Sequence, residues 1–141
     1  MFNVFIDGRE GTTGLQIYDR LAKRGDCNIL VLPEDKRKDV AARKECLNSA
    51  DIIFLCLPDA AAREAVSLIE NQHSRVIDAS TAHRTAEGWV YGLPELSDER
   101  REKIAKADRV ANPGCHATGF ITLVAPLVKA GIAGADYPFV A

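Results

Sequence analysis

The sequence predicts an α/β fold: a Rossmann-like, doubly wound and mostly parallel sheet. Short apolar stretches alternate with amphipathic, helix-forming stretches through the first half of the chain, at the spacing of βαβ units. A glycine-rich turn at residues 8–14 joins the first apolar stretch to the first amphipathic one. The length of 141 residues, with 47% hydrophobic and 27% charged residues, suits one soluble domain with a buried core.

Strands and helices are expected to alternate in the first half of the chain. Residues 2–6 form the first strand, and the apolar spacing of the next segment predicts a helix closed by Gly25 as its C′ residue. A second strand at 27–32 is stopped by Pro33 and followed by a charged connection. A weak helix is expected at 40–49, a strand at 51–57, a helix at 60–70 and a strand at 75–78. Cys56, within the third strand, is expected to be a small core residue.

The regular alternation stops after Asp78. Ser97 is expected to cap the N-terminus of a helix that runs to about residue 107, with two acidic residues in its first turn. The last expected elements are a strand at 109–111, a helix over about 117–130 that ends at Gly131, and the beginning of a strand at 136–141.

Charge and cysteine pattern argue against several classes of protein. The net charge is −2 at pH 7, so no basic field favours nucleic acid or an anionic membrane as a partner. The apolar runs are too short to span a bilayer, and the N-terminus lacks the basic region of a signal peptide, so a cytoplasmic location is expected. The four cysteines are scattered without ligand spacing, which argues against a metal site and favours reduced thiols.

The glycine-rich turn is the first candidate binding site. Gly8, Gly11 and Gly14 form a G-x-x-G-x-x-G variant of the dinucleotide fingerprint, and Thr12 and Thr13 can add hydroxyl donors. Such a turn lets the backbone approach a pyrophosphate and aims a helix N-terminus at it. The strand before the turn and the helix after it favour nucleotide binding over a plain tight turn.

The choice of nicotinamide cofactor depends on the residues after the second strand. Glu34 is near the place of the acidic residue that holds the ribose of NAD. Lys36, Arg37 and Lys38 follow at once and can hold a 2′-phosphate, with Lys36 and Arg37 as the candidate cofactor residues. This charge run slightly favours NADP, and the alternative is a solvated loop.

Cys115 is the expected reacting group. It follows an Asn-Pro-Gly turn and stands where an apolar helical run begins. A thiol at a helix N-terminus meets the positive end of the helix dipole, which favours the nucleophilic thiolate. A nucleotide domain followed by such a cysteine suggests an acyl-enzyme that a hydride reduces. The alternative is a small buried cysteine.

Five polar residues are considered as neighbours of this thiol. Asn112 can supply an amide for orientation or for an oxyanion. Arg84, just beyond a strand end, is a candidate holder of an anion such as phosphate, with a solvated surface arginine as the alternative. His116 is not expected to act as the base, because adjacent residues on a helix do not face each other. His83 can serve only if the fold brings it close, and His73 is expected at the surface.

Four segments together resemble N-acetyl-gamma-glutamyl-phosphate reductases, in particular the shorter of that family's two types. In order along the chain they are DGREGTTGL, DASTAHR, YGLPEL and NPGCHATG, at 7–15, 78–84, 91–96 and 112–119. The family is similar to aspartate-semialdehyde dehydrogenase in fold and chemistry. The resemblance implies a step of arginine biosynthesis in which NADPH reduces N-acetyl-gamma-glutamyl phosphate, a small acyl phosphate, to N-acetylglutamate 5-semialdehyde.

The resemblance also assigns roles to residues. Cys115 matches the nucleophile that attacks the acyl phosphate, expels phosphate and leaves a thioester for the hydride to reduce. Arg84 matches a position linked to the substrate phosphate. The cofactor loop of the family matches Gly8, Gly11, Thr12, Thr13 and Gly14.

The sequence departs from the family in length. Family members continue into a second α/β domain that carries the catalytic histidine and most of the subunit interface. The resemblance thus implies an NADP-binding Rossmann domain at 1–114 and, at 115–141, the catalytic-cysteine helix with the start of a catalytic and dimerisation domain. It further implies that these 141 residues are inactive by themselves and that the full-length protein is a homo-oligomer. The alternatives are an aspartate-semialdehyde-type reductase, against which the loop at 8–14 argues, and a non-catalytic nucleotide-binding module.

Overall fold

The computed structural model describes residues 1–134, 136 and 138. Within these residues, six strands form one sheet in which all neighbours pair in parallel, in the order β2-β1-β3-β4-β6-β5. The strands are β1 (Phe2–Asp7), β2 (Cys27–Leu30), β3 (Ile52–Leu55), β4 (Arg75–Asp78), β5 (Val90–Tyr91) and β6 (Arg109–Ala111). The helices are α1 (Thr12–Leu21), α2 (Val40–Ser49), α3 (Asp59–Ser67), α4 (Asp98–Lys106) and α5 (Cys115–Lys129), with short 3₁₀ turns η1 (Glu34–Lys36) and η2 (Pro94–Leu96). The predicted fold class is confirmed.

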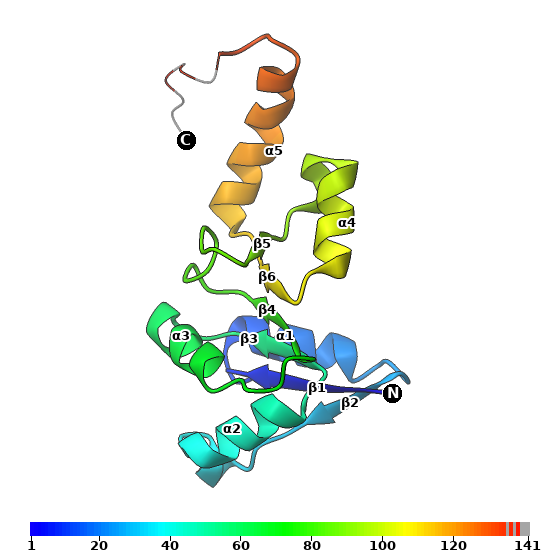
Figure 1. Ribbon diagram of the computed structural model, residues 1–141, viewed down its shortest axis with the longest axis vertical. Coiled ribbons are helices and arrows are strands. Elements are labelled where there is room, and N and C mark those ends of the chain that lie inside the picture. Colours follow the sequence, from blue (N-terminus) through cyan, green and yellow to red (C-terminus); the bar gives the residue numbers. More distant parts are fainter. Residues whose placement is uncertain (135, 137, 139–141) are drawn as a thin grey trace.

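The strand order creates a crevice between β1 and β3. From β1 the chain moves through α1 to β2 on one side, and it then moves through α2 to β3 on the other side. Because such crossovers are right-handed, α1 lies on one face of the sheet and α2 and α3 lie on the opposite face (Figure 1). Loops that leave the carboxyl ends of β1 and β3 therefore diverge, and ligands of doubly wound sheets bind in that crevice.

The core lies between the sheet and the helix pair α2 and α3. Phe5, Ile53 and Val76 stand side by side in the strand register and are at most 2% exposed. Burial of each such side chain contributes about 1.5–3 kcal/mol to folding. They pack with side chains of α2 and α3 in one cluster that includes Leu47, Ala50, Ala62 and Ala65.

The opposite face of the sheet is covered unevenly. Val4 and Ile6 of β1 are buried where α1 packs against this strand and β2. Phe54 of β3 and Ile77 of β4, on the same face, are half-buried. The sequence predicts a sheet covered on both faces, and this is correct near α1 but only partly met at β3 and β4.

Two of the predicted helix ends are confirmed by their hydrogen bonds. The Oγ of Ser97 accepts a hydrogen bond from the backbone N–H of Arg100 at 3.1 Å, as expected of an N-cap. At the end of α5, Gly131 has a φ of 70°. The N–H groups after the helix donate back into its last turn, from Gly131 to Val128 and from Ile132 to Leu127, both at 3.0 Å. This is a Schellman motif, which needs the left-handed conformation that glycine adopts freely.

Other predicted boundaries are wrong. Gly25 is not the C′ residue of α1, because the helix already has its C-cap at Ala22. Cys56 lies just after β3 rather than inside it, since the pairing of β3 with β1 ends at Leu55. Helix α5 begins at Cys115 itself, and α3 ends at Ser67, whose Oγ donates to a carbonyl of its own helix at 2.6 Å. The short β5 was not predicted, and the strand expected at 136–141 falls mostly outside the described residues.

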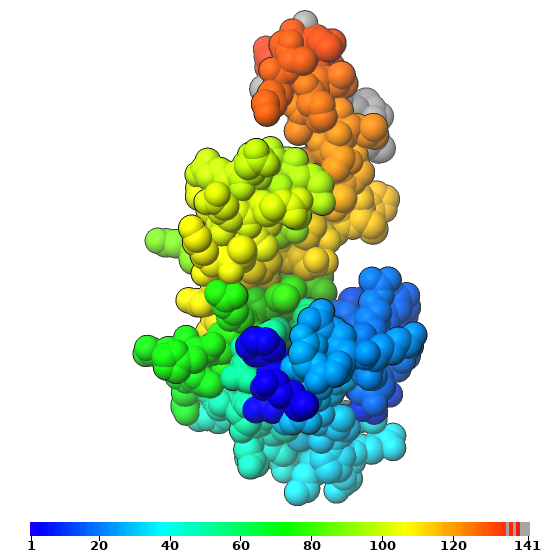
Figure 2. Space-filling model, turned by 90° about the vertical axis from the view of Figure 1, so that its right-hand side faces the viewer, coloured from blue at the N-terminus to red at the C-terminus, as the bar shows by residue number. Residues whose placement is uncertain are grey.

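Helices α4 and α5 extend beyond the sheet and its covering helices. Figure 1 shows α5 leading away from the end of β6, and Figure 2 shows α4 and α5 standing together above the rest of the molecule. Along α5, Leu123 is 73% exposed, and Ile132 just after the helix is 70% exposed. In the part of the chain that the structure describes, no helix combines the length and the apolar composition that crossing a bilayer requires.

The substitution Gly8→Ala is expected to lower the free energy of unfolding by about 2 kcal/mol or more. Gly8 has a φ of 84°, and a Cβ there would stand 2.2 Å from the backbone oxygen of Cys56. The matched control is Gly25→Ala, where a Cβ meets no atom within 4 Å, so that the change stays within about 0.5 kcal/mol. Urea unfolding followed by the fluorescence of Trp89 measures both variants. Equal stabilities of the two would contradict the close approach.

Candidate functional site

Four loops meet along one edge of the sheet. They leave the carboxyl ends of β1, β3, β4 and β6, which are neighbours in the strand order. The loop after β1 is the glycine-rich turn, and the loop after β3 begins with Cys56. The loop after β4 carries His83 and Arg84, and the loop after β6 leads to Cys115. Most of the candidate residues therefore lie on neighbouring loops.

The glycine-rich turn has no space for side chains at two of its glycines. A Cβ on Gly8 would stand 2.2 Å from the carbonyl oxygen of Cys56. A Cβ on Gly14 would stand 2.4 Å from the oxygen of Gly8. The N–H of Gly11 donates to that same oxygen at 3.2 Å, which closes the turn. A backbone packed this tightly at the start of α1 fits the pyrophosphate of a dinucleotide, which binds backbone N–H groups at a helix N-terminus.

A cleft of about 300 Å³ opens beside this turn. It is lined by Gly11, Thr12, Thr13, Gly14, Cys56, Leu57 and Ala79, from the loops after β1, β3 and β4. Within the described residues neither threonine hydroxyl has a hydrogen-bond partner, so both are available to a ligand. The structure thus places four of the predicted cofactor residues in one cleft.

A second cleft of about 360 Å³ lies on the other side of the turn, between the ends of β1 and β2. Gly8 lines it together with basic side chains from three segments, namely Arg9, Arg37, Lys38 and Arg43. Of the charge run after β2, Arg37 and Lys38 line this cleft. Lys36 is exposed and does not line it, and neither does Glu34, whose side chain is 88% exposed.

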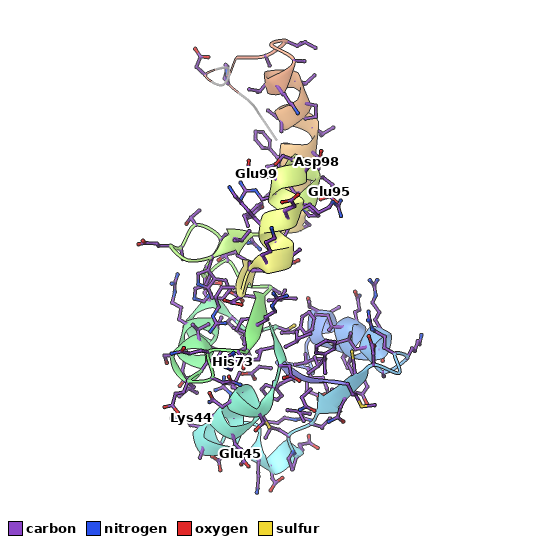
Figure 3. All side chains as sticks on the ribbon, turned by 45° about the vertical axis from the view of Figure 1, so that its right-hand side comes forward. Lys44, Glu45, His73, Glu95, Asp98 and Glu99 are labelled. Atoms are coloured by element: carbon purple, nitrogen blue, oxygen red, sulfur yellow. The ribbon has the colours of Figure 1, made fainter. Side chains whose placement is uncertain are left out.

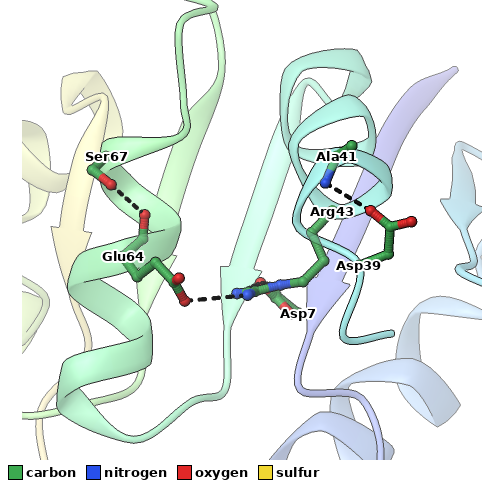
Figure 4. A network of polar contacts seen from close by, with 6 residues as sticks. All are labelled: Asp7, Asp39, Ala41, Arg43, Glu64 and Ser67. Atoms are coloured by element: carbon green, nitrogen blue, oxygen red, sulfur yellow. Dashed lines mark hydrogen bonds and ion pairs between the residues drawn. The ribbon is translucent and has the colours of Figure 1, made fainter. Parts of the chain in front are cut away.

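A buried ion pair between Asp7 and Arg43, which the sequence does not predict, lines the second cleft. Arg43 of α2 donates through Nη2 to Oδ2 of Asp7 at 2.9 Å and through Nη1 to Oε2 of Glu64 at 3.3 Å (Figure 4). Burial lowers the pKa of the Arg43 guanidinium, but hydrogen bonds and charge attraction from Asp7 and Glu64 outweigh it and raise that pKa overall. No sequence pattern identifies this pair, because its members are 36 residues apart.

The loop after β4 is held by a buried carboxylate. Asp78 is fully buried, and its carboxylate accepts from the backbone N–H of Ser80 at 2.9 Å and from the Ser80 hydroxyl at 2.7 Å. The Nδ1 of His83 lies 2.6 Å from Oδ2 of Asp78. The His83 ring also stacks on Trp89, with centroids 4.2 Å apart. His83 is therefore engaged in holding this loop, and the structure does not show it acting on Cys115.

The held loop carries Arg84 to the start of α5. A Cβ on Gly114 would stand 2.7 Å from Nη1 and 2.9 Å from Nη2 of Arg84, so the guanidinium lies against the N-cap residue of the helix. Cys115, the first residue of α5, is exposed beside it. Among the described residues, the Arg84 side chain has no hydrogen bond, and its buried Nε has no acceptor. The structure brings together a cation and a thiol that sequence analysis had proposed separately.

The other predicted neighbours are placed differently. Asn112 is exposed, and its Nδ2 donates to the carbonyl of Pro113 at 3.2 Å. His116 is exposed and, within the described residues, makes no hydrogen bond to Cys115. His73 is exposed at the surface, as expected, and is labelled in Figure 3. Nowhere in the described part of the chain do three or more His, Cys, Asp or Glu side chains form a group that could hold a metal ion.

The other three thiols lie in environments that disfavour the thiolate. Burial raises the pKa of Cys56 to about 11, and nearby carboxylates add to the effect. Burial is also the largest cause of the raised pKa values of Cys46 and Cys27, again with support from neighbouring carboxylates. At neutral pH these groups remain thiols, whereas Cys115 is exposed at a helix N-terminus.

Comparison with known proteins identifies relatives of this chain. Residues 32–107 match the family described as semialdehyde dehydrogenase, NAD binding domain. The chain is 63% identical over 135 residues to N-acetyl-gamma-glutamyl-phosphate reductase 2 of Pseudomonas putida, a match that covers 96% of this chain and 43% of the relative. The chain therefore spans less than half the length of that curated relative.

Solved structures of low sequence identity share the fold. Aspartate semialdehyde dehydrogenase from Francisella tularensis is 18% identical with a TM-score of 0.68, and the match covers 93% of this chain and 42% of that one. Aspartate semialdehyde dehydrogenase with NADP from Candida albicans is 13% identical with a TM-score of 0.62, over 92% of this chain and 47% of that one.

Iodoacetamide at pH 7 is expected to alkylate Cys115 at least about ten times faster than Cys27, Cys46 or Cys56, because only a thiolate reacts. The raised pKa values of the other three thiols keep them protonated until the pH approaches those values. Peptide mass spectrometry at several reaction times gives the four rates. Cys115→Ser is the control and should remove the fast phase, and equal reactivity of all four thiols would contradict this order.

Proposed function

Because the chain belongs to the semialdehyde dehydrogenase family through its NAD binding domain, we propose that it supplies the cofactor cleft and the nucleophile of an NADPH-dependent acyl-phosphate reductase. The substrate proposed is N-acetyl-gamma-glutamyl phosphate, and the product is N-acetylglutamate 5-semialdehyde, a step of arginine biosynthesis. The name of the Pseudomonas putida relative supports this substrate. The observation that carries the proposal is the Arg84 guanidinium against Gly114, next to the exposed thiol of Cys115.

Cys115 is proposed as the nucleophile. Its sulfur attacks the carbonyl carbon of the acyl phosphate, the bond from that carbon to the phosphate oxygen breaks, and inorganic phosphate leaves and takes up a proton. The chemistry that NADPH supplies when bound is a hydride to the carbon of the resulting thioester. The carbon–sulfur bond then breaks, which releases the aldehyde and returns the Cys115 thiolate.

Arg84 is proposed to bind the substrate phosphate. Its guanidinium presents several N–H donors in one plane, a geometry that suits phosphate oxygens. The N–H groups at the start of α5 face the same region and favour negative charge. Asn112 is proposed to contact the substrate as well, through a side-chain amide that is exposed and bonded only to the adjacent carbonyl of Pro113.

The nucleotide is proposed to lie across both clefts. The pyrophosphate sits on the turn at Gly8, Gly11 and Gly14 with the hydroxyls of Thr12 and Thr13, the adenosine in the larger cleft, and the nicotinamide in the smaller one near Ala79. Arg37 and Lys38 in the larger cleft favour a 2′-phosphate and hence NADP, with Lys36 of the same loop as an outer contact. The NADP complex of the Candida albicans neighbour is consistent with this choice.

Several further features of the whole enzyme belong to this proposal. The division into a cofactor domain at 1–114 and a second domain from 115 onward fits α5, which leads away from the sheet with exposed apolar side chains. The Pseudomonas putida relative is more than twice as long as the matched part, and the acid–base histidine and the homo-oligomer interface are assigned to that further length. A cytoplasmic enzyme is proposed.

One equivalent of N-acetyl-gamma-glutamyl phosphate is expected to acylate the chain once, on Cys115, with release of one equivalent of phosphate and little further turnover. Acylation needs the thiolate and the phosphate site but not the histidine. Intact-mass spectrometry and a phosphate assay measure both products, and NADPH added afterwards should discharge the acyl group only slowly, because the acid–base histidine is assigned to the further length. Acylation of Cys115→Ser to the same extent, or sustained reductase turnover by the 141-residue chain, would overturn these assignments.

Arg84→Ala is expected to slow the release of phosphate by about 100-fold, and Arg84→Lys by about tenfold, because lysine keeps the charge but loses the planar fork. Arg63→Ala is the matched control, since Arg63 is an exposed arginine on α3. Initial rates of phosphate release at varied substrate concentration give the comparison. If Arg84→Ala and Arg63→Ala behave alike, Arg84 does not hold the phosphate.

A further inference from the structure

One carboxylate in the larger cleft is shared by two arginines. The Nη2 of Arg37 lies 2.9 Å from Oε1 of Glu10, and the Nε of Arg9 lies 3.3 Å from the same oxygen. Arg9 and Glu10 belong to the glycine-rich turn and Arg37 follows η1, so the three side chains come from two separate segments. All three line the cleft proposed for the adenosine. An anionic group therefore already occupies the point where two guanidinium groups converge.

These ion pairs are easily exchanged. The side chains of Arg9, Glu10 and Arg37 are 29%, 51% and 37% exposed. Ion pairs this exposed contribute at most about 1 kcal/mol to stability, so opening them costs little. The Asp7–Arg43 pair in the same cleft is different, because its side chains are only 9% and 10% exposed. The buried pair is a fixed part of the cleft wall, whereas Glu10 is free to move out.

Arg9 keeps its place by a contact that does not involve Glu10. Its guanidinium carbon stands over the ring of Tyr18 in α1, 4.8 Å from the ring centroid. This cation–π contact contributes roughly 0.5–1 kcal/mol at an exposed site. When Glu10 moves away, Arg9 therefore remains in position to bind another anion.

We propose that Glu10 sets the cofactor preference by competing with the 2′-phosphate for Arg9 and Arg37. The inference rests on the proposed nucleotide function and deepens it. With NADPH, the 2′-phosphate takes the place of the carboxylate between the two guanidinium groups, where two forks hold its oxygens. With NADH, Glu10 stays between the arginines and accepts a hydrogen bond from the ribose 2′-hydroxyl, the role that an acidic residue has in NAD sites. One side chain thus opposes the phosphorylated cofactor and favours the other.

The test is equilibrium binding of NADPH, NADH and 2′,5′-ADP to the wild-type chain and to Glu10→Gln. The substitution removes the competing charge and weakens the acceptor, so NADPH and 2′,5′-ADP should bind about 3- to 10-fold tighter and NADH about 3- to 10-fold weaker. The gain in NADPH affinity should shrink as the salt concentration is raised from about 50 mM to about 500 mM. The Debye length shortens over this range, so the charge attraction is screened. Glu70→Gln, which breaks the exposed pair with Lys44 elsewhere on the surface, is the matched control and should leave all three affinities within about twofold.

The outcomes separate this inference from the function on which it rests. If the wild-type chain binds NADPH but Glu10→Gln changes NADPH and NADH affinity in the same direction, or changes neither, Glu10 does not set the preference while the nucleotide site stands. If the wild-type chain binds neither nucleotide, the proposed function fails, and this inference fails with it. A second variant, Arg9→Ala, should weaken NADPH about tenfold and NADH less than about threefold, and an equal loss of both contradicts the role of Arg9.

Discussion

The last hydrogen bonds between β1 and β3, between β3 and β4, and between β4 and β6 set the level from which the functional loops begin. The N–H of Cys56 donates to the carbonyl of Asp7 at 2.8 Å, and the N–H of Ala79 donates to that of Leu55 at 2.9 Å. The N–H of Asn112 donates to the carbonyl of Asp78 at 2.8 Å. These bonds continue the parallel ladder one residue beyond the strands, so three loops leave the sheet at the same height. The glycine-rich turn, Arg84 and Cys115 can then adjoin one another along one edge of the sheet.

At that level the backbone chains come so close that side chains are excluded at particular points. Gly8 touches the backbone after β3, Gly14 touches Gly8, and Gly114 lies against the guanidinium of Arg84. The first two contacts bring the nucleotide turn onto the end of β3. The third brings the guanidinium of Arg84 onto the helix that carries Cys115. Glycine is therefore required by the backbone geometry at positions 8 and 14, whereas at Gly114 the close neighbour is the end of a flexible side chain.

The sequence predicts well whatever depends on neighbours along the chain. Helix α2 has the predicted bounds because the carboxylate of Asp39 caps it, accepting from the N–H groups of Ala41 and Ala42. The strand before it is shorter than predicted, because β2 ends at Leu30 and not at Pro33. The ends marked by Ser97 and Gly131 are correct for the same local reason. The site fragments were found as motifs, since the glycine turn and the Asn-Pro-Gly-Cys segment each lie on one loop. Gly25 failed because a glycine after a helix does not by itself decide where the helix ends.

What the sequence does not predict are contacts between distant loops. The Asp7–Arg43 pair, the shared carboxylate of Glu10 and the packing of Arg84 on Gly114 all join segments brought together by the sheet. No periodicity or spacing encodes such contacts, because each partner alone is an ordinary charged residue. Arg37 could thus be predicted as a phosphate ligand, but its ion pairs with Glu10 at 2.9 Å and Glu34 at 3.8 Å could not.

The two arginine sites differ in how their charge is balanced, and the difference follows from their environments. Arg9 and Arg37 lie in a cleft with a carboxylate between them, so a nucleotide phosphate must displace an anion to bind. The guanidinium of Arg84 makes no ion pair among the described residues, and its Nε is buried without an acceptor. Its charge acts on Asp59, whose pKa is lowered chiefly by hydrogen bonds from Thr81 and least by Arg84. A buried donor without a partner costs about 1–3 kcal/mol of folding free energy. The contact between Asp78 and His83 helps to hold the loop of Arg84 in place despite that cost. A phosphate that binds the Nη groups of Arg84 would therefore displace no paired carboxylate, whereas the 2′-phosphate proposed for the larger cleft would compete with Glu10.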